Sequence, residues 1–576
     1  MRFFNLKNLA AFLCCTLAFF AFTSLSVCHA QDVSGMTGMV TDQSGAAIPG
    51  ATVVLSNAAT GAIYKQTTNS IGSYRFAQIP PGVGYSAHIT AKGFAPVTIS
   101  SISLLVNQVR TQNASMNVGT QISTVEVTAN GAVTIDTTDA LVGNDLDPQQ
   151  LNNLPVQQRN DPLALFAMQP GVTDTGSVTG ARVDQNDVTL DGLDVNDFAT
   201  GGASQGNAGS GITTQLGTIV GHAPIDSVEE FQGNVAGNQA ATGPAAGGQF
   251  ALVTKSGTNQ FHGDLNEYHR DTSLTANSWF SNDANPIVPR QHLIHNQFGG
   301  SAGGPILRNR AFFFFDFNDS RVVAGSVVTR TVPSPSLRQG SIRYCTASPC
   351  ANNNKTLTMA EVNAFDPAGI GVDQNWLNFI NKRFPSPNQT GGGDGLNSLG
   401  YIFNAPNNDN ETNYVSRIDY RINPSMNLWG RFTITREDAV YAPNEFPGDP
   451  VTSPFTDRSY AFVIGHDWVM GSNKTNRLFL GETVQKVGYP INYNPTGTTA
   501  FTFGDGADNS MSSNPYIWPD SQARRVPNEQ LGDNFSLVKG RHTWQFGGVL
   551  KDILAHDTTA ADFNISEIGL GGHVFS

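Results

Sequence analysis

The feature of this sequence that most limits its fold is a series of long extended runs beyond residue 247. We count about eleven such runs, each alternating apolar and polar residues over the ~9–11 positions that a tilted strand needs to cross a bilayer. Strands of soluble sandwiches and propellers are typically shorter, at about five or six residues. Strand length therefore predicts an antiparallel transmembrane sheet. The clearest runs are 310–319, 321–332, 413–422, 426–436, 460–470, 477–487, 531–538 and 542–550.

Helices are not available for crossing lipid, because no apolar run of about 18 residues follows the N-terminal region. A chain without such helices can cross only as a barrel, in which every backbone polar group is paired. Two long polar loops, 334–411 and 492–529, contrast with short turns, and this asymmetry assigns the long loops to the outer side. Aromatic residues recur near the ends of the runs, as in an interfacial girdle: Tyr414, Trp429, Tyr460, Trp468 and Trp544.

Residues 1–30 have the layout of a cleaved secretory signal peptide, with basic residues, an apolar run over 9–25, and CHA before Gln31. The alternative, a lipid-modified Cys28, is disfavoured because Val27 stands where a small residue is expected. We therefore expect an exported protein.

Export also bears on the two cysteines outside this region, Cys345 and Cys350, which lie in the polar loop SIRYCTASPC. In an oxidising compartment a local disulfide between them is favoured over two free thiols. Such a bridge would fasten a loop and implies no catalysis.

Two modules precede the long runs. Residues 31–120 alternate short β-rich runs with turns that contain Gly and Pro, which predicts a small β-sandwich of about seven strands. Residues 130–248 are richer in glycine, with a short helix predicted over 163–168 and a strand over 187–190 that ends in a turn at Asp191-Gly192. The second module is therefore expected to be α+β.

The passage into the long runs is predicted to be a β-hairpin. Two period-2 runs, 249–254 and 260–270, flank the tetrad Lys255-Ser256-Gly257-Thr258. Gly257 can supply the positive φ that a tight reversal needs. On this interpretation the transmembrane sheet begins at residue 249 and occupies 249–576.

Several segments resemble those of a known family, and they occur in the same order along the chain as in that family. VTKSGTNQFHG at 253–263, HNQFGGSAGGPI at 295–306 and RAFFFFDFNDSR at 310–321 resemble the passage from plug to barrel in Oar-like TonB-dependent outer-membrane receptors. GMVTDQSGAAIPGATVVLSN, within 31–120, resembles the non-catalytic carboxypeptidase regulatory-like domain. The resemblance implies a plug over 130–248 inside a barrel, a place in the cell outer membrane in contact with its lipid, and a periplasmic N-terminal domain.

The linker 121–129, QISTVEVTA, is either an ordinary extended connection or a TonB box. A TonB box acts by β-augmentation, in which an exposed strand pairs with the sheet edge of a TonB-type energy-coupling protein. Its position before the plug favours the second interpretation. The residues expected to make this contact are Thr124, Val125, Glu126, Val127 and Thr128.

Other classes of function find little support. A net charge of −13 without a basic cluster excludes nucleic acid as a partner. No histidine is followed by glutamate three residues later, the pair that a zinc carboxypeptidase would use. GASQG at 202–206 matches a nucleophile elbow but follows no apolar strand. We therefore expect no enzyme and no cofactor.

Two sets of residues could bind metal in principle. The aspartates lack the spacing of a calcium loop and are more commonly turn caps, and barrel strands hold such histidines routinely. We therefore expect no metal. These sets are Asp184, Asp187, Asp191, Asp194 and Asp197, and His262, His269, His292 and His295.

Two functions remain open. The first is a transport receptor whose plug and outer loops bind an oligosaccharide, peptide or protein and whose plug is displaced by TonB. The second is an adhesion or surface-assembly protein that binds polysaccharide or protein. A lumen that holds a folded plug needs roughly 22 strands. We therefore expect this chain to form only the N-terminal part of a barrel and a complete relative to continue beyond it.

Overall fold

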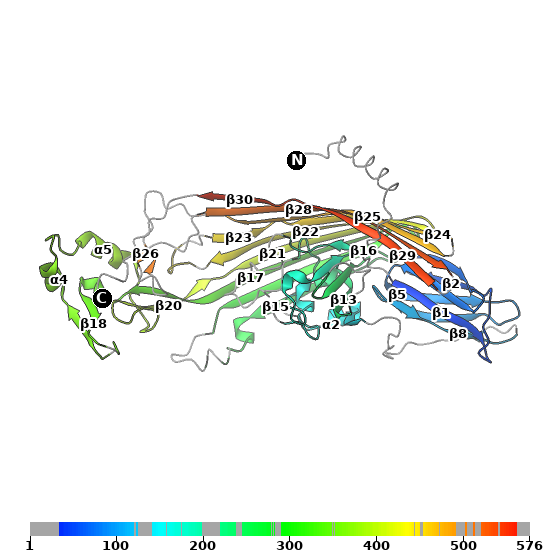
Figure 1. The fold of residues 1–576 in the computed structure, drawn as a ribbon, viewed down its shortest axis with the longest axis horizontal. Coiled ribbons are helices and arrows are strands. Elements are labelled where there is room, and N and C mark those ends of the chain that lie inside the picture. The colour runs from blue at the N-terminus through cyan, green and yellow to red at the C-terminus, as the bar shows by residue number, and fades with distance from the viewer. Residues whose placement is uncertain are drawn as a thin grey trace, which may run out of the picture.

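The computed structural model is mainly β, as predicted, and contains a sandwich, a plug and one large antiparallel sheet (Figure 1). It describes residues 34–119, 123–124, 141–156, 158–173, 176–198, 219–237, 245–277, 279, 282, 290–347, 349–350, 352–442, 444–449, 453–471, 473–490, 502–503, 511–512, 520–539 and 542–561. The expected signal peptide lies outside the described residues. No helix in the described part is long and apolar enough to span a membrane.

The N-terminal module is a two-sheet sandwich, drawn in blue in Figure 1. One sheet has the order β4-β1-β7 with β8 also on β1, and the other has the order β3-β2-β5-β6-β9. Alternate residues of both sheets point inward and form one apolar core that includes Met36, Leu55, Phe76 and Ile102. The strands are β1 Ser34–Asp42, β2 Thr52–Asn57, β3 Ala62–Thr67, β4 Ser73–Ile79, β5 Gly82–Thr90, β6 Val97–Leu104, β7 Val109–Thr111, β8 Ala114–Met116 and β9 Ser123–Thr124.

The plug is built on a five-stranded sheet with the order β10-β13-β14-β11-β12. Phe166 stacks on Phe250, with ring centroids 3.9 Å apart, at the centre of its apolar core. The predicted helix over 163–168 is a shorter 3₁₀ turn, and the predicted strand over 187–190 is confirmed as β11. The elements are β10 Val142–Leu146, α2 Pro148–Asn153, η1 Pro162–Leu165, η2 Val183–Gln185, β11 Asp187–Leu190, β12 Leu193–Asp194, η3 Ile225–Ser227, β13 Val228–Ala236 and β14 Gln249–Thr254.

The predicted β-hairpin around Lys255 is wrong. Strand β14 pairs with β13 and β11 in the plug sheet, whereas the strand that follows it, β15 His262–Asp271, pairs with β16 in the large sheet. Gly257 is needed for a different reason from the one predicted: its φ is not positive, but a Cβ atom there would lie 2.2 Å from the Phe313 carbonyl oxygen. The tetrad therefore carries the chain from plug to barrel wall at close backbone contact.

The large sheet contains twelve strands, and each pairs antiparallel with its neighbours. The predicted runs 310–319 and 321–332 are one strand, β17, because no turn residue separates them. In the described part the sheet is open, with β15 and β29 at the ends of its order. The strands after β15 are β16 Leu293–Leu307, β17 Ala311–Pro333, β20 Ser398–Pro406, β21 Asp409–Asn423, β22 Met426–Ala442, β23 Ser453–Asp457, β24 Tyr460–Met470, β25 Lys474–Tyr489, β28 Asp520–Lys539, β29 His542–Ile553 and β30 His556–Ala561.

The two faces of the large sheet differ in the way that a membrane requires. Ile464 and Phe432 are 52% and 42% exposed on one face, whereas their chain neighbours Val463 and Arg431 are buried on the other. An apolar exposed face opposite a face rich in buried polar residues is the reverse of a soluble sheet. The exposed face is therefore suited to lipid, and the buried face surrounds the plug.

The segment 334–397 is more than the polar loop that the sequence predicts. Helix α5 packs an apolar cluster with Val332 and Phe446, and a second helix, α4, and a small β-hairpin also lie at the end of the molecule away from the sandwich (Figure 1). The helix α4 begins with a capping box between Thr358 and Glu361. The elements here are η6 Leu337–Gln339, β18 Ile342–Cys345, β19 Asn354–Leu357, α4 Met359–Phe365 and α5 Gln374–Arg383; the short elements elsewhere are η5 Thr272–Leu274, β26 Thr502–Phe503 and β27 Met511–Ser512.

We expect Gly257→Ala to destabilise the folded chain, because the new methyl group would collide with the β17 backbone. Overpacking of this kind typically costs about 1–3 kcal/mol. The free energy of unfolding in denaturant measures the effect. Gly430→Ala is the matched control, since a Cβ atom there would approach other atoms no closer than 3.5 Å. Equal unfolding midpoints for the two variants would contradict this account.

Candidate functional site: the interface between plug and barrel wall

Polar side chains cover the inner face of the large sheet where it meets the plug. Along β21 and β22, residues directly opposite each other point to the same side. The pair Arg417 and Arg431 is in register, and both guanidinium groups reach the plug. The interface between plug and wall therefore includes buried charges and hydrogen bonds.

Asp191 is the centre of the strongest contact in this interface. One carboxylate oxygen accepts a hydrogen bond from Arg417 at 2.9 Å, and the other forms an ion pair with Arg431 at 2.9 Å. Thr254 donates to the same carboxylate from its backbone N–H at 3.0 Å and its hydroxyl at 2.8 Å. The side chains of Asp191 and Arg431 are 2% and 0% exposed, so the pair is shielded from water.

Local structure places Asp191 at this point. It occupies the turn between β11 and β12 with φ of 53°, a left-handed conformation that Asp tolerates better than most residues. Burial alone would raise the pKa of Asp191, but the charges of Arg417 and Arg431 and the bonds from Thr254 outweigh it and lower the pKa. The carboxylate is therefore ionised inside the lumen.

Trp429 supports the arginines from the wall. The guanidinium groups of Arg417 and Arg477 lie 5.3 and 4.8 Å from the centroid of its ring. Asp419 pairs with Arg417 at 3.0 Å, and Asp467 pairs with Arg477 at 3.1 Å. Stacking on the ring and these carboxylates orient the arginines before the plug contributes its own charge.

A second contact joins the plug to the half of the wall that lies away from the sandwich. His222 Nε2 lies 2.8 Å from Glu411 Oε1, and the Thr433 hydroxyl donates to the Gly221 carbonyl at 2.6 Å. Gly221 has φ of +58°, and a Cβ atom there would lie 2.8 Å from the Ala461 backbone nitrogen. The plug turn is therefore pressed directly against strands β22 and β24.

The His222 pair is charged under ordinary conditions. Burial alone would lower the pKa of His222, but the hydrogen bond and charge of Glu411, with the charge of Asp161, raise it to about 10. The imidazolium and the carboxylate therefore attract each other at neutral pH.

Three further contacts surround the plug. Lys551 of β29 pairs with Asp194, whose backbone is also bonded to the Gln530 side chain. Ser227 donates to Asp316 of β17 at 2.7 Å. Within the plug, Arg159 pairs with Asp226 at 2.7 Å, and its guanidinium lies 5.2 Å from the Tyr268 ring of the wall. These bonds hold the plug at many points of its rim.

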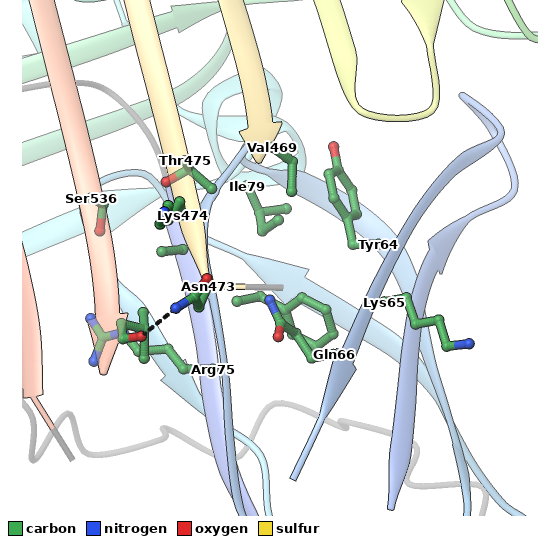
Figure 2. A pocket seen from close by; sticks show the side chains of 13 residues that line it. Tyr64, Lys65, Gln66, Arg75, Ile79, Val469, Asn473, Lys474, Thr475 and Ser536 are labelled. Carbon is green, nitrogen blue, oxygen red and sulfur yellow. Dashed lines mark hydrogen bonds between the residues drawn. The ribbon is translucent and has the colours of Figure 1, made fainter. Parts of the chain in front are cut away.

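The sandwich contacts both the plug and the turns at the end of the barrel opposite the long loops. The Val106 N–H donates to Glu230 of β13 at 2.6 Å, and Val106 packs with Ala251 and Val253 of β14. Figure 2 shows a small cavity where β3 and β4 meet the ends of β24, β25 and β28. Its volume of about 20 Å³ holds a water molecule or so and no ligand. This junction is therefore a packing contact.

The residues predicted for partner binding are only partly described. Thr124 belongs to β9, which pairs parallel with β6 at the edge of the sandwich. Val125, Glu126, Val127 and Thr128 lie outside the described residues, so the TonB box stays a prediction. The Cys345 and Cys350 sulfur atoms are 2.24 Å apart in the outer segment, with their Cα atoms 5.2 Å apart.

The candidate metal ligands have other partners. Asp184 pairs with Arg182, Asp191 with two arginines and Asp194 with Lys551. His295 contacts the Ser320 hydroxyl at 3.0 Å, and His269 contacts the Asn296 side chain at 2.6 Å. The described residues include no group of three or more His, Cys, Asp or Glu side chains placed to bind a metal ion. The Gly202–Gly206 string lies outside the described residues.

Sequence reasoning missed the partners of Asp191. It identified the Asp191-Gly192 turn, but not Arg417 and Arg431, which lie far away in the chain. A usable signal was present, because both arginines interrupt predicted membrane-crossing runs. A charged residue within such a run usually faces the interior and has a functional partner.

Two family models match this chain, one over the large sheet and one over the N-terminal sandwich. A family model described as an outer membrane beta barrel domain matches residues 253–572, and one described as a carboxypeptidase regulatory-like domain matches residues 35–117. A curated relative, the TonB-dependent transporter Oar of Myxococcus xanthus, is 25% identical over 286 residues, which are 47% of this chain and 25% of the relative. The chain thus spans about a quarter of the length of this relative.

Three solved structures are also similar. The outer membrane transporter YddB from Escherichia coli is 10% identical with a TM-score of 0.39, covering 73% of this chain and 54% of its own. The ferric-catecholate import receptor Fiu from E. coli K12 is 11% identical with a TM-score of 0.37, covering 73% and 61%. The ferric enterobactin receptor PfeA from Pseudomonas aeruginosa is 10% identical with a TM-score of 0.37, covering 73% and 55%.

We expect Asp191→Asn to loosen the plug, because Arg417 and Arg431 would lose the carboxylate that both contact. Breaking a buried ion pair on one side typically costs about 3–5 kcal/mol. Limited proteolysis of the plug measures the change as a faster rate of cleavage. Asp184→Asn is the control, since it alters an exposed pair on the same module. Equal cleavage rates for both variants would refute the role of Asp191.

The His222 contact should depend on pH. Its pKa in the folded chain, about 10, is above the ordinary value of 6.5, so its contribution to stability is complete below pH 6.5 and is lost as the pH rises through about 10. We expect protection of the plug from protease to decline across this window. His222→Gln should start with weaker protection and change less, while His88→Gln, at an exposed position of β5, should behave like the unaltered chain. A pH profile unaffected by His222→Gln would exclude this contact as the cause.

Proposed function

Because the chain belongs to the outer membrane beta barrel domain family, we propose that it acts in the outer membrane as a TonB-dependent receptor that imports a ligand. Membership places the chain in the outer membrane, with the N-terminal sandwich on the periplasmic side. The name of the curated Myxococcus relative, a TonB-dependent transporter, supports transport over adhesion. The name of this relative is that of a transporter and not of an enzyme.

The observation that carries the proposal is the contrast between the core of the plug and its surface. Among the described residues, the main apolar cluster of the plug consists of plug residues, with Val415 as its one buried member from the wall. Contacts to the wall include many ion pairs and hydrogen bonds, centred on Asp191 and His222, beside a small apolar contact that Leu193 of β12 makes with the wall. A module with its own core and a polar interface can be displaced without losing its fold, because water can replace polar contacts more readily than apolar packing.

Energy coupling is proposed to act through the linker 121–129. A TonB-type protein would pair with the strand formed by Thr124, Val125, Glu126, Val127 and Thr128. The linker precedes β10, an edge strand of the plug sheet. Tension on the linker would therefore act on the plug directly, and the Asp191 and His222 contacts would resist it.

We also propose the division of the chain into a signal peptide at 1–30, the sandwich at 31–120, the linker at 121–129, the plug from 130 and the barrel strands up to 576. The plug is extended from residue 248 to Thr254, because β14 pairs only within the plug sheet. The disulfide between Cys345 and Cys350 would stabilise the segment 334–397, which lies on the outer side, where the ligand arrives.

We expect Val127→Pro to abolish energised uptake. Proline removes a backbone N–H and cannot take part fully in a ladder of strand hydrogen bonds. Copurification with the TonB-type partner and uptake by cells that express the chain should both fall at least about tenfold, while Val127→Ala should retain both. An adhesion protein would be indifferent to either change. Normal uptake by the proline variant would contradict the proposal.

A further inference from the structure

Carboxylates are concentrated on the inner face of the outer half of the barrel wall, away from the arginines that contact Asp191. Glu411 of β21 lies directly opposite Glu437 of β22, and Glu437 lies directly opposite Asp457 of β23. Glu411 contacts His222 of the plug, so the side chains of this row point into the lumen. Figure 1 shows β21, β22 and β23 side by side in the half of the sheet away from the sandwich.

Like charges directly opposite each other on neighbouring strands destabilise a sheet. Asp409, two residues before Glu411, lies on the same face of β21, and one of its carboxylate oxygens is buried with no hydrogen-bond partner in the described part. Among the described residues, the basic side chain of the plug that contacts this row is His222, which pairs with Glu411. Among the described residues, the row therefore holds more carboxyl groups than basic partners.

Other basic residues nearby are committed elsewhere. Arg458 donates to the backbone carbonyls of Glu437 and Asp457, while its ion pair is with Asp438 on the opposite face of β22. Arg524, two strands beyond Asp457, pairs with Asp557. The segments 199–218 and 491–519 contain no lysine or arginine in the sequence. They cannot supply a cation to this row.

Independent evidence comes from buried acceptors beside the row. Asn413 is fully buried next to Glu411; its side-chain nitrogen donates to Glu411 at 2.6 Å, while its side-chain oxygen has no hydrogen-bond partner in the described part. Asn160 of the plug, 5% exposed, donates to Glu411 and likewise has an oxygen without a donor there. Unpaired buried acceptors are costly, and here they surround the same carboxylates. A group rich in hydrogen-bond donors would satisfy these acceptors.

We propose that Glu411, Glu437 and Asp457, with Asp409, form a binding site for a positively charged group of the imported ligand, an ammonium or a guanidinium. This inference rests on the proposed uptake function and names the chemistry of the ligand. Neighbouring strands are about 4.8 Å apart, so the row extends over roughly 10 Å. That spread suits an elongated cation with several N–H donors better than a metal ion, whose ligands must converge within about 2.6 Å.

Two sources of this chemistry can be distinguished by calorimetric titration of the full purified chain in detergent. The probes are spermidine, a small polyamine, and the tripeptide Arg-Arg-Arg. We expect at least one of them to bind, and the probe that binds more tightly identifies the source. The double variant Glu437→Gln/Asp457→Asn should lose at least about tenfold in affinity, because two of the attracting charges are removed.

Asp438→Asn is the matched control. It removes one negative charge from the residue next to Glu437, but on the opposite face of β22, where Asp438 is exposed and paired with Arg458. Its affinity should equal that of the unaltered chain. Glu437→Gln alone is a milder variant and should show an intermediate loss; since neutralisation reduces repulsion within the row, folding should be preserved.

The inference is overturned if the unaltered chain binds neither probe, or if the double variant binds as tightly as Asp438→Asn. Titration needs no energy coupling, so this result is separate from that of the uptake experiment. Binding that depends on Glu437 and Asp457 in a chain that imports nothing would refute the proposed transport and leave the cation site standing. Uptake with unchanged affinity in the double variant would refute the cation site alone.

Discussion

The arrangement of the molecule depends on one buried carboxylate, that of Asp191, held between two arginines of the barrel wall. Taking these charges out of water costs several kcal/mol for each ion, and the cost is recovered only when all partners are in place. The contact therefore specifies position more than it adds stability. A plug rotated or shifted along the lumen would take the Asp191 carboxylate away from both arginines and leave Arg417 with Asp419 alone, which penalises such placements.

Alternation and strand length were sufficient to predict the sandwich, the transmembrane sheet and the turn at Asp191-Gly192, because these depend on local patterns. The prediction of a hairpin was wrong because alternation with a period of two residues is found in any strand. All six residues of β14 are buried, as expected of a strand inside a sheet that is covered on both faces. Its nearly continuous apolar run, Phe250-Ala251-Leu252-Val253, was the signal that separated it from β15, most of whose residues are exposed.

The contacts that could not be predicted from the sequence join residues that lie far apart in the chain. Asp191 meets Arg417 across 226 positions of the chain, and no local pattern encodes that pairing. The small domain in 334–397 was missed for a related reason: its apolar cluster joins Val332, Leu377 and Phe446 from three separate segments. In both cases the partners are brought together by packing between elements far apart in the chain, which a single sequence does not reveal.

Charge along the lumen wall links ligand binding to plug release. On β21 and β22 the acidic pair Glu411 and Glu437 lies six residues from the arginine pair Arg417 and Arg431, roughly 20 Å along the strand. In the plug, Asp191 pairs with the two arginines, and His222 pairs with Glu411 of the acidic pair. A cation bound to Glu437 and Asp457 would reduce the attraction of the row for His222, and by reciprocity a plug held at His222 would bind that cation less tightly. Such a ligand would loosen the outer contact of the plug while leaving the Asp191 contact to be broken by tension from the periplasm.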